Sequence, residues 1–462
     1  MVSLDSSIFR AYDIRGIVNQ SLTLESVYLI GRAIGSQALE KNQNSIAVGF
    51  DGRISSPFLA EALCEGILST GCDVLDVGMV PTPILYYATF ALNTRSGVMI
   101  TGSHNPPEYN GFKIVINGET LAEDSIQQLY QRIINNDFED GIGEYCEIDL
   151  AGQYIKYIED TVKVKRPLRI VIDAGNAVPG MVAPELYRRL ECEVHELFCK
   201  VDGNFPNHHP DPSQAENLTA LVQAVKEHQA DVGIAFDGDG DRLGVVTPQG
   251  KVIWPDRQLI LFAQAVLEKN PKGKIIYDVK CTTHLADAIR SAGGEPIMWK
   301  TGHSLVKAKL AETGALLAGE MSGHIFFKDR WFGFDDAIYA GARLLEILAE
   351  KKEDIDALFA AIPDSINTPE LKISVAESEK FAVMDSLFAQ LHSSKEFKKA
   401  EVQTIDGLRI NFADGWGLVR PSNTTPCLVL RFEAINEVIL KNIQEAFRGL
   451  LLSVNPNFAL PF

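Results

Sequence analysis

Short apolar runs recur along the chain, each followed by an amphipathic stretch. The runs at 46–51, 168–173 and 274–278 are rich in β-branched or aromatic residues, and each ends in Asp. Such runs are typical of buried strands that open onto a polar loop. A helical pattern follows each run, at 56–70, 180–190 and 283–292, and a further short strand pattern follows each helix, at 73–77, 193–197 and 295–299. Three βαβ units with mainly parallel sheets are therefore predicted.

Each unit continues into one more apolar strand with an unusual loop at its end. The strand at 97–101 leads into Gly-Ser-His-Asn, the strand at 231–236 into Asp-Gly-Asp-Gly-Asp-Arg, and the strand at 315–318 into Gly-Glu-Met-Ser-Gly-His. Ligands of open α/β sheets bind beyond the carboxyl ends of the strands. We therefore expect the three loops to face a common cleft.

The last hundred residues follow a different pattern. Alternating strands are predicted at 402–412 and 428–433, joined through Gly-Trp-Gly, with a helix at 436–451 and a linker at 363–369. The predicted fold class is α/β: three repeated mixed α/β domains with mainly parallel sheets plus a C-terminal α+β domain, arranged around a central cleft. The predicted domains span 1–147, 148–252, 253–363 and 364–462, and each carries one of the candidate loops.

Composition narrows the class of protein. The 462 residues are 46% hydrophobic and 23% charged, as in ordinary globular proteins, and no apolar run is long enough to cross a bilayer. A formal net charge of −18 argues against binding nucleic acid or an anionic membrane, but not against a small anionic substrate. Seven cysteines without a C-x-x-C pair, and an N-terminus unlike a secretory signal, predict a cytoplasmic protein with reduced thiols.

The densest acidic cluster is Asp237, Asp239 and Asp241, separated by glycines. Three carboxylates so close together repel one another and gain from a shared divalent cation. An EF-hand is excluded, because Arg242 and Pro248 stand where that loop needs Gly and Glu. A site with so few carboxylates suits Mg²⁺, which shares its shell with phosphate oxygens and water. A solvated acidic turn is the alternative.

Ser103 follows a predicted strand, between Gly102 and His104. It is a candidate turn residue, helix cap or nucleophile. A metal site that shares phosphate oxygens, beside a serine at the end of a neighbouring strand, favours a phosphorylated serine, whose charge Lys113 and His104 would offset. No Gly-x-Ser-x-Gly elbow and no Walker A motif occurs in the chain.

Two further loops carry candidate binding groups. Glu320 and Ser322 alternate, so both could face the hydroxyls of one sugar, and His324 could move a proton. A structural histidine is the alternative for His324. The loop beginning at Arg420 combines a guanidinium with hydroxyl, amide and backbone donors, as a phosphate dianion requires, and a capped turn is the alternative.

Taken together, the four motifs in this order resemble the α-D-phosphohexomutase superfamily, most closely its bacterial phosphomannomutase/phosphoglucomutase branch. The resemblance extends from 9 to 462. It implies that Ser103 is phosphorylated and holds Mg²⁺ with Asp237, Asp239 and Asp241. It implies catalytic roles for Lys113, Arg242, Arg15 and His324, with His104 near the phosphoserine. The substrate-binding residues that it implies are Tyr12, Lys280, His303, Glu320, Ser322, Arg420, Ser422, Asn423 and Thr424.

The implied activity interconverts the 1-phosphates and 6-phosphates of mannose and of glucose, with glucose 1,6-bisphosphate or mannose 1,6-bisphosphate as activator. Asn423 and Thr425 replace the Gly and Glu of the commonest superfamily pattern, a variant that resembles the phosphomannomutase/phosphoglucomutase branch. Met321 replaces the Gln usual in phosphoglucosamine mutases. The alternatives are a phosphomannomutase alone, a phosphoglucosamine mutase, a sugar phosphatase and a phosphosugar sensor. The implied protein is a monomer that binds a phosphosugar but neither nucleic acid nor membrane.

Overall fold

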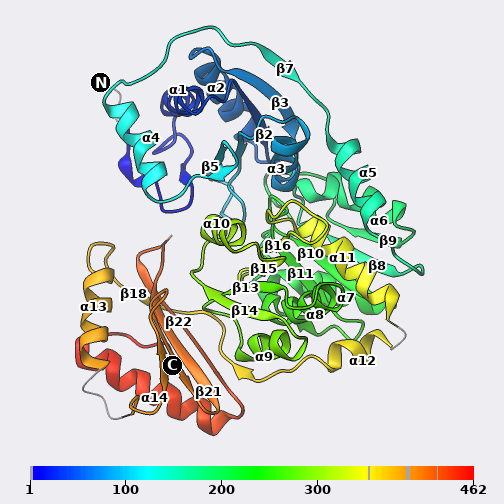
Figure 1. Cartoon of the computed structure of the whole chain (residues 1–462), viewed down its shortest axis with the longest axis vertical. Coiled ribbons are helices and arrows are strands. Elements are labelled where there is room, and N and C mark those ends of the chain that lie inside the picture. Colours follow the sequence, from blue (N-terminus) through cyan, green and yellow to red (C-terminus); the bar gives the residue numbers. More distant parts are fainter. Residues whose placement is uncertain (1–3, 352–353, 392–395, 424) are drawn as a thin grey trace.

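The computed structural model describes residues 4–351, 354–391, 396–423 and 425–462. Four sheets succeed one another along this part of the chain. In Figure 1 the first sheet lies at the top, the second and third lie together in green and yellow below it, and the orange-red C-terminal sheet lies at the lower left. Among the described residues, no helix combines the length and the apolar composition needed to cross a bilayer.

The first domain is built on a mixed seven-stranded sheet in the order β1-β5-β4-β2-β3-β7, with β6 paired to β5. Strands β4, β2, β3 and β7 run parallel, whereas β5 is antiparallel to both β1 and β4. The elements are η1 (Ser6–Ile8), β1 (Ile14–Ile17), α1 (Leu24–Glu40), β2 (Ser45–Phe50), α2 (Ser56–Leu68), β3 (Asp73–Met79), α3 (Thr82–Ala91), β4 (Gly97–Ile100), β5 (Tyr109–Ile116), β6 (Glu119–Thr120), α4 (Asp124–Ile134) and β7 (Tyr145–Glu147).

The second and third domains repeat this plan with fewer strands. Their sheets run β12-β11-β10-β8-β9 and β14-β13-β15-β16, parallel at the core and antiparallel at one edge. The second comprises α5 (Ala151–Thr161), β8 (Arg169–Asp173), η2 (Val178–Met181), α6 (Ala183–Arg189), β9 (Glu193–Leu197), η3 (Ala215–Leu218), α7 (Thr219–Glu227), β10 (Val232–Phe236), β11 (Leu243–Val246) and β12 (Val252–Ile253). The third comprises α8 (Pro255–Lys269), β13 (Lys274–Asp278), α9 (Thr283–Ser291), β14 (Glu295–Trp299), α10 (His303–Thr313), β15 (Leu317–Gly319), β16 (Ile325–Phe327), α11 (Ala337–Glu350) and α12 (Ile355–Ala360).

The predicted repeat is confirmed. The pairs β2/β3, β8/β9 and β13/β14 are parallel, and each is joined by its predicted helix. The third strand of each unit, β4, β10 or β15, pairs in parallel on the other side of the first strand. The predicted α/β fold class with a different C-terminal domain is therefore confirmed, whereas the exact domain boundaries stay predictions.

The fourth sheet is antiparallel and runs β17-β22-β21-β20-β19, with β18 also paired to β22. Its elements are β17 (Ile366–Asn367), β18 (Leu371–Ser374), α13 (Lys380–Leu391), β19 (Glu401–Gln403), β20 (Leu408–Phe412), β21 (Gly415–Pro421), β22 (Cys427–Ala434) and α14 (Glu437–Val454).

Three predictions about the fourth domain were wrong in detail. The expected strand at 402–412 is two antiparallel strands, β19 and β20, because both halves alternate and the pattern hides the turn between them. Gly-Trp-Gly opens β21 rather than joining two strands, and a Cβ on Gly417 would lie 2.5 Å from the ring of Phe447 on α14. That glycine allows a helix to pack closely on the sheet. The expected linker at 363–369 contains β17, which pairs with β22.

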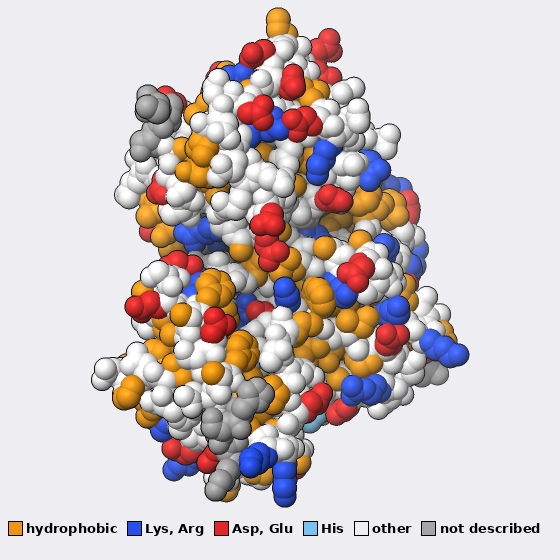
Figure 2. Space-filling model, turned by 60° about the vertical axis from the view of Figure 1, so that its left-hand side comes forward, with side chains coloured by type: hydrophobic (Ala, Val, Ile, Leu, Met, Phe, Trp, Pro, Cys, Tyr) orange, Lys and Arg blue, Asp and Glu red, His pale blue; other side chains and the backbone are white. Residues whose placement is uncertain are grey.

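One hydrophobic core extends across domains one to three, which also have separate clusters of their own, whereas the fourth domain has its own core. The rings of Tyr87 from α3 and Tyr339 from α11 both stack with the shared core's Trp331, with ring centroids 6.3 and 4.2 Å away. A small apolar cluster and polar contacts join the fourth domain to the third, among them Arg409 Nη1 donating to the carbonyl oxygen of Val279 at 2.5 Å. Figure 2 shows an indentation between the upper and lower parts of the molecule, with charged side chains at its edges. The fourth domain is thus the part held least by apolar packing.

Candidate active site

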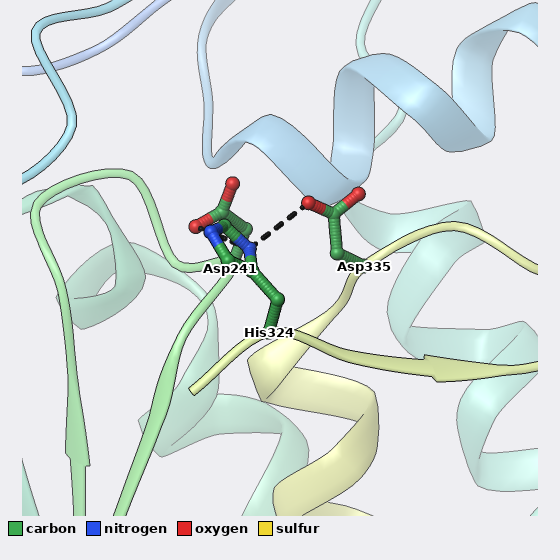
Figure 3. A group of neighbouring side chains, drawn as sticks. All are labelled: Asp241, His324 and Asp335. Carbon is green, nitrogen blue, oxygen red and sulfur yellow. Dashed lines mark ion pairs between the residues drawn. The ribbon is translucent and has the colours of Figure 1, made fainter. Parts of the chain in front are cut away.

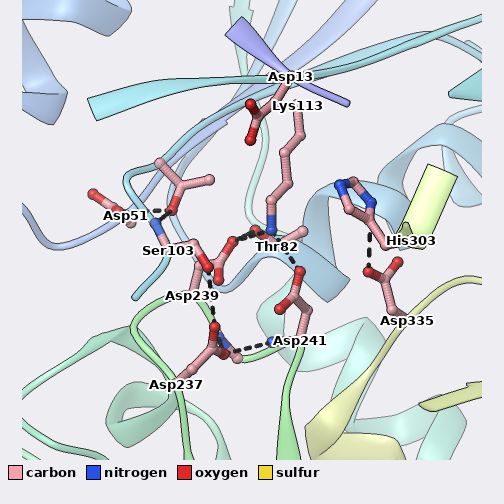
Figure 4. Close-up of polar contacts among 12 residues, drawn as sticks. Asp13, Asp51, Thr82, Ser103, Lys113, Asp237, Asp239, Asp241, His303 and Asp335 are labelled. Atoms are coloured by element: carbon pink, nitrogen blue, oxygen red, sulfur yellow. Dashed lines mark hydrogen bonds and ion pairs between the residues drawn. The ribbon is translucent and has the colours of Figure 1, made fainter. Parts of the chain in front are cut away.

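The three predicted loops meet, as expected from their positions after β4, β10 and β15. Leu243 N donates to the carbonyl oxygen of Gly323 at 3.1 Å, which joins the second and third loops. The first loop reaches the second through Ser103 Oγ, which lies 3.1 Å from Asp237 Oδ2 (Figure 4). Residues from three sheets therefore form one buried polar centre.

Ser103 has a left-handed backbone, with φ of 49°, and a buried side chain. Its amide donates to Thr101 Oγ1 at 2.8 Å, and its Oγ also lies 3.2 Å from His104 Nδ1. A Cβ on Gly238 would lie 2.2 Å from the carbonyl oxygen of Ser103, so only glycine lets the acidic loop approach the serine this closely. Burial lowers the pKa of His104 well below its usual value, with help from the nearby cation Arg242.

Arg53, which we did not predict as a site residue, holds the serine loop in shape. Its buried guanidinium donates to the carbonyl oxygens of Ser103, Asn105, Pro106 and Tyr109 at 2.6–3.1 Å. Asp51, the last residue of the first apolar run, pairs with Arg53 Nε at 3.2 Å and accepts from the amide of Gly102 at 3.1 Å. The Asp at the strand end was visible in the sequence, but its partners were not.

All three carboxylates of the second loop are fully buried. Lys113 Nζ donates to Asp239 Oδ2 at 2.6 Å and to Asp241 Oδ2 at 2.5 Å, and Thr82 Oγ1 donates to Asp239 Oδ2 at 2.5 Å. Burial and the two neighbouring carboxylates raise the pKa of Asp237 well above its usual value. Burial would also raise the pKa of Asp239, but Lys113 outweighs it and lowers that pKa. The cluster holds more negative charge than Lys113 alone offsets.

The residues of this loop fit a divalent metal. Ligand atoms of Asp237, Asp239 and Asp241 lie within 4.8 Å of one another. Asp239 Oδ1 and Asp241 Oδ1 are buried without a hydrogen-bond partner among the described residues. Buried carboxylate oxygens left unpaired are costly unless a cation binds them. With Ser103 Oγ beside Asp237, the same cation could contact a phosphate carried on the serine.

His324 lies between two carboxylates, as Figure 3 shows. Its Nδ1 is 3.1 Å from Asp335 Oδ2 and 3.4 Å from Asp241 Oδ1. Its Nε2 accepts a hydrogen bond from Arg242 Nε at 3.1 Å. The ring of His303 stacks on it with centroids 5.5 Å apart. Asp335 was not among the predicted site residues.

The remaining predicted residues from the first and third domains lie around this centre. Glu320 is buried and accepts from the amide of Gly302 at 2.6 Å, and burial raises its pKa. Lys280 Nζ pairs with Glu370 Oε1 at 2.6 Å. Arg15 on β1 pairs with Asp13. Ser322 is half-buried in the turn between β15 and β16.

The fourth domain contributes the loop between β21 and β22. Arg420 is buried; its Nε donates to Asp406 Oδ2 at 2.9 Å, and its Nη2 has no hydrogen-bond partner among the described residues. Ser422 Oγ accepts from the amide of Thr425 at 3.1 Å. Asn423 Nδ2 donates to the hydroxyl of Tyr12, which itself donates to Thr301 O at 2.7 Å. Thr424, another predicted residue, lies outside the described residues.

The fold and the site define the α-D-phosphohexomutase class of protein. The models of the phosphoglucomutase/phosphomannomutase family match in chain order: α/β/α domain I at 6–140, domain II at 152–250, domain III at 254–366 and the C-terminal domain at 370–450. The chain belongs to this family of phosphohexomutase enzymes, which act on phosphosugars. The resemblance stated from the motifs is thereby confirmed.

Individual relatives are similar to this chain over its full length. A phosphomannomutase/phosphoglucomutase of Pseudomonas aeruginosa is 54% identical over 460 residues, covering 100% of this chain and 98% of its own. A phosphoglucomutase of Neisseria gonorrhoeae is 54% identical over 465 residues, covering 100% of both chains. A crystal structure of a family protein from Burkholderia thailandensis superposes with a TM-score of 0.94 at 52% identity, covering 99% of this chain and 100% of its own.

Proposed function

We propose that this protein interconverts the 1-phosphate and 6-phosphate of mannose and of glucose through a phosphoserine at 103 and a 1,6-bisphosphate. The observation that carries the proposal is the 3.1 Å approach of Ser103 Oγ to Asp237, with a separate phosphate-type loop in the fourth domain. A reacting phosphate and a second, non-reacting phosphate need two such sites. Phosphomannomutase/phosphoglucomutase and phosphoglucomutase, the names of relatives about half identical over the full length, agree with this substrate class.

In the forward step, the free 6-hydroxyl of a hexose 1-phosphate attacks the phosphorus on Ser103. A bond forms from the sugar oxygen to phosphorus, and the bond from phosphorus to Ser103 Oγ breaks, its electrons staying on Oγ. The hydroxyl proton passes to His324 as general base, and Ser103 Oγ takes up a proton in exchange, so the serine ends as a neutral hydroxyl. The bisphosphate then turns over, and its 1-phosphate returns to Ser103 by the reverse chemistry. Positioning and charge stabilisation supply most of the rate in such transfers.

Mg²⁺ held by Asp237, Asp239, Asp241 and the phosphoserine would offset charge on the transferring group. Lys113 and Arg242 surround the same centre with fixed positive charge. Burial would lower the pKa of Lys113, but Asp239 and Asp241 outweigh it and raise the pKa well above its usual value. Both side chains therefore stay cationic at working pH, and the buried setting keeps water from the phosphoserine.

Arg420, Ser422 and Asn423 are proposed to bind the phosphate that is not reacting. The Nη2 of Arg420, which has no partner in the described part of the chain, gives that group a donor. Glu320 and Ser322 are proposed to bind sugar hydroxyls in both orientations, with Tyr12, Lys280 and His303 around them. Glucose 1,6-bisphosphate or mannose 1,6-bisphosphate is the proposed activator, because it phosphorylates the serine directly. We also propose a cytoplasmic monomer.

A coupled isomerisation assay with Mg²⁺ and a trace of glucose 1,6-bisphosphate tests the function. Mannose 1-phosphate and glucose 1-phosphate are each compared for wild type, Ser103→Ala and the control Ser386→Ala, whose exposed side chain donates to Ala382 O on its own helix. We expect activity on both sugars, lost at least about 10³-fold in Ser103→Ala alone. Activity on one sugar would restrict the substrate. Release of free phosphate without isomerisation would indicate a phosphatase, and an unimpaired Ser103→Ala would refute the phosphoserine.

A further inference from the structure

We propose that Asp335 is a positioning residue for His324, holding the imidazole with its proton on Nδ1 and its lone pair on Nε2. The inference rests on the proposed function in one respect, because that function gives His324 a proton to transfer. It concerns a residue that none of the four motifs contains.

The position of Asp335 is fixed by the fold. It lies between β16 and α11, where it forms a β-bridge with Phe326, and the next residue caps α11. Its side chain is fully buried. Oδ2 lies 3.1 Å from His324 Nδ1 as an ion pair, and neither atom makes a hydrogen bond among the described residues. The next ion-pair partners are farther away, at 3.4 Å for Nδ1 and 3.8 Å for Oδ2, so each atom is the nearest such partner of the other.

The other oxygen of Asp335 is held by a lysine. Lys307 Nζ donates to Oδ1 at 3.1 Å and lies 4.0 Å from the ring centroid of Tyr86. Burial would raise the pKa of Asp335, but Lys307 and His324 outweigh it and lower the pKa well below its usual value. The carboxylate is therefore ionised and can only accept hydrogen bonds, so the nitrogen facing it must carry the proton.

The far side of the ring leads to the same tautomer. Arg242 Nε can only donate, and it donates to His324 Nε2 at 3.1 Å, so that nitrogen presents its lone pair. A neutral imidazole then carries its single proton on Nδ1, between Asp335 and Asp241. The same three side chains are close enough to bind a metal. A metal on Nδ1 would require a proton on Nε2, which the guanidinium of Arg242 opposes, so the geometry favours an oriented base.

Asp335 suits the orienting role better than Asp241. Asp241 lies 3.4 Å from Nδ1, pairs with Lys113 through its other oxygen and belongs to the loop that fits the metal. Asp335 is closer and belongs to the third domain, as His324 does. Before Nε2 can take a proton, Arg242 must give up its hydrogen bond to that nitrogen. The charge that then appears on the ring faces a carboxylate already in place. The same division of roles occurs wherever a buried carboxylate orients a catalytic histidine.

The first test reads the tautomer directly. Nitrogen-15 NMR of histidine-labelled protein at mildly alkaline pH, with His324→Gln to assign the signal, should show His324 protonated on Nδ1. In Asp335→Asn the proportion of the Nδ1–H form should fall. A wild-type signal with a proton on Nε2 would overturn the proposal, whether or not any variant folds and whether or not the protein isomerises phosphosugars.

The second test is kinetic. We expect Asp335→Asn to lower kcat at least about 10²-fold, the scale of general acid–base catalysis, with KM changed less than about threefold. The double variant with His324→Gln should be no slower than His324→Gln alone, because Asp335 acts through that ring. The matched control is Asp336→Asn, the adjacent buried carboxylate, which bonds Tyr154 and Tyr339 instead. Additive losses in the double variant, or an equal loss in Asp336→Asn, would overturn the proposal.

Discussion

Ser103 Oγ lies 3.1 Å from Asp237 Oδ2, although 134 positions separate the two residues and they belong to different sheets. The contact places the candidate phosphate acceptor beside the candidate metal site. It depends on Gly238, since a Cβ there would strike the backbone of the serine. The chemistry proposed for this protein therefore depends on how two domains pack.

Asp237→Asn should separate the metal's effect from the carboxylate's own effect on stability. The raised pKa of Asp237 shows that its charge is unfavourable when buried without a metal. In EDTA the variant should therefore have a Tm equal to or above wild type. Saturating Mg²⁺ should reverse the order, because a ligand at about 100 times its Kd stabilises by about 2.7 kcal/mol. Thermal unfolding with and without Mg²⁺ measures the Tm under both conditions, and the exposed Asp287→Asn is the control. An equal rise of Tm with Mg²⁺ in wild type and in both variants would contradict a metal at Asp237.

Arg53→Lys should impair phosphorylation of Ser103. A lysine cannot reproduce the planar fork that donates to several carbonyl oxygens at once, so the serine loop loses its shape. We expect phosphoryl transfer from glucose 1,6-bisphosphate to the serine to slow at least about 10-fold, the equivalent of one lost hydrogen bond to a charged group. Intact-protein mass spectrometry over time measures it. The control is Arg95→Lys, whose guanidinium donates to a carbonyl on an exposed loop. Wild-type transfer in Arg53→Lys would refute the role.

Arg420→Lys should weaken binding more than chemistry. A bidentate guanidinium bonds a phosphate dianion better than a point charge does. Because Arg420 is proposed to bind the non-reacting phosphate, KM for the phosphosugar should rise about 10-fold or more, while kcat falls less. Steady-state kinetics on both sugars measures the changes in KM and in kcat separately. Arg448→Lys, on α14 of the same domain, is the control; a fall in kcat at unchanged KM would place Arg420 elsewhere in the mechanism.

Tyr12→Phe should loosen the fourth domain. The hydroxyl of Tyr12 bonds both Thr301 O and Asn423 Nδ2, so it ties the first domain to the third and the fourth. The fourth domain otherwise has its own core. Small-angle X-ray scattering without substrate should therefore show a larger radius of gyration for the variant than for wild type. Tyr28→Phe on α1 is the control, and an unchanged radius in Tyr12→Phe would show that other contacts hold the domain.

Asp336 predicts a pH dependence of stability. Burial raises its pKa to about 7, although hydrogen bonds from the amide of Tyr339 and the hydroxyl of Tyr154 oppose the shift. Between about pH 4 and 7 the folded state thus keeps a proton that the unfolded state has lost, so stability falls with rising pH, by at most about 1.4 kcal/mol per unit. Asp336→Asn cannot ionise and should remove this contribution. The Tm of the variant should gain on wild type as pH rises through that window; a constant difference would refute the shift.

The repeat and the identity of the loops follow from the sequence alone. Strand and helix periodicities are local, so three βαβ units and the strands ending at Ser103, Asp237 and Glu320 could be predicted from neighbouring residues. The Asp at the end of the first strand of each βαβ unit could be identified from the same local pattern. The local pattern was misleading where it continued across a turn, at 402–412, where a glycine served helix packing at 417 rather than a turn, and where the expected linker at 363–369 contains a strand.

Which groups meet depends on the tertiary packing. Arg53 and Asp335 stand in segments without a distinctive motif. Arg53 contacts the carbonyl oxygen of Ser103, 50 positions away, and Asp335 contacts His324 from a different connection of the third domain. The contact between Tyr12 and Asn423 spans 411 positions. Such pairings depend on how buried faces pack and how charges are compensated in the interior, and no local pattern in the chain records either one.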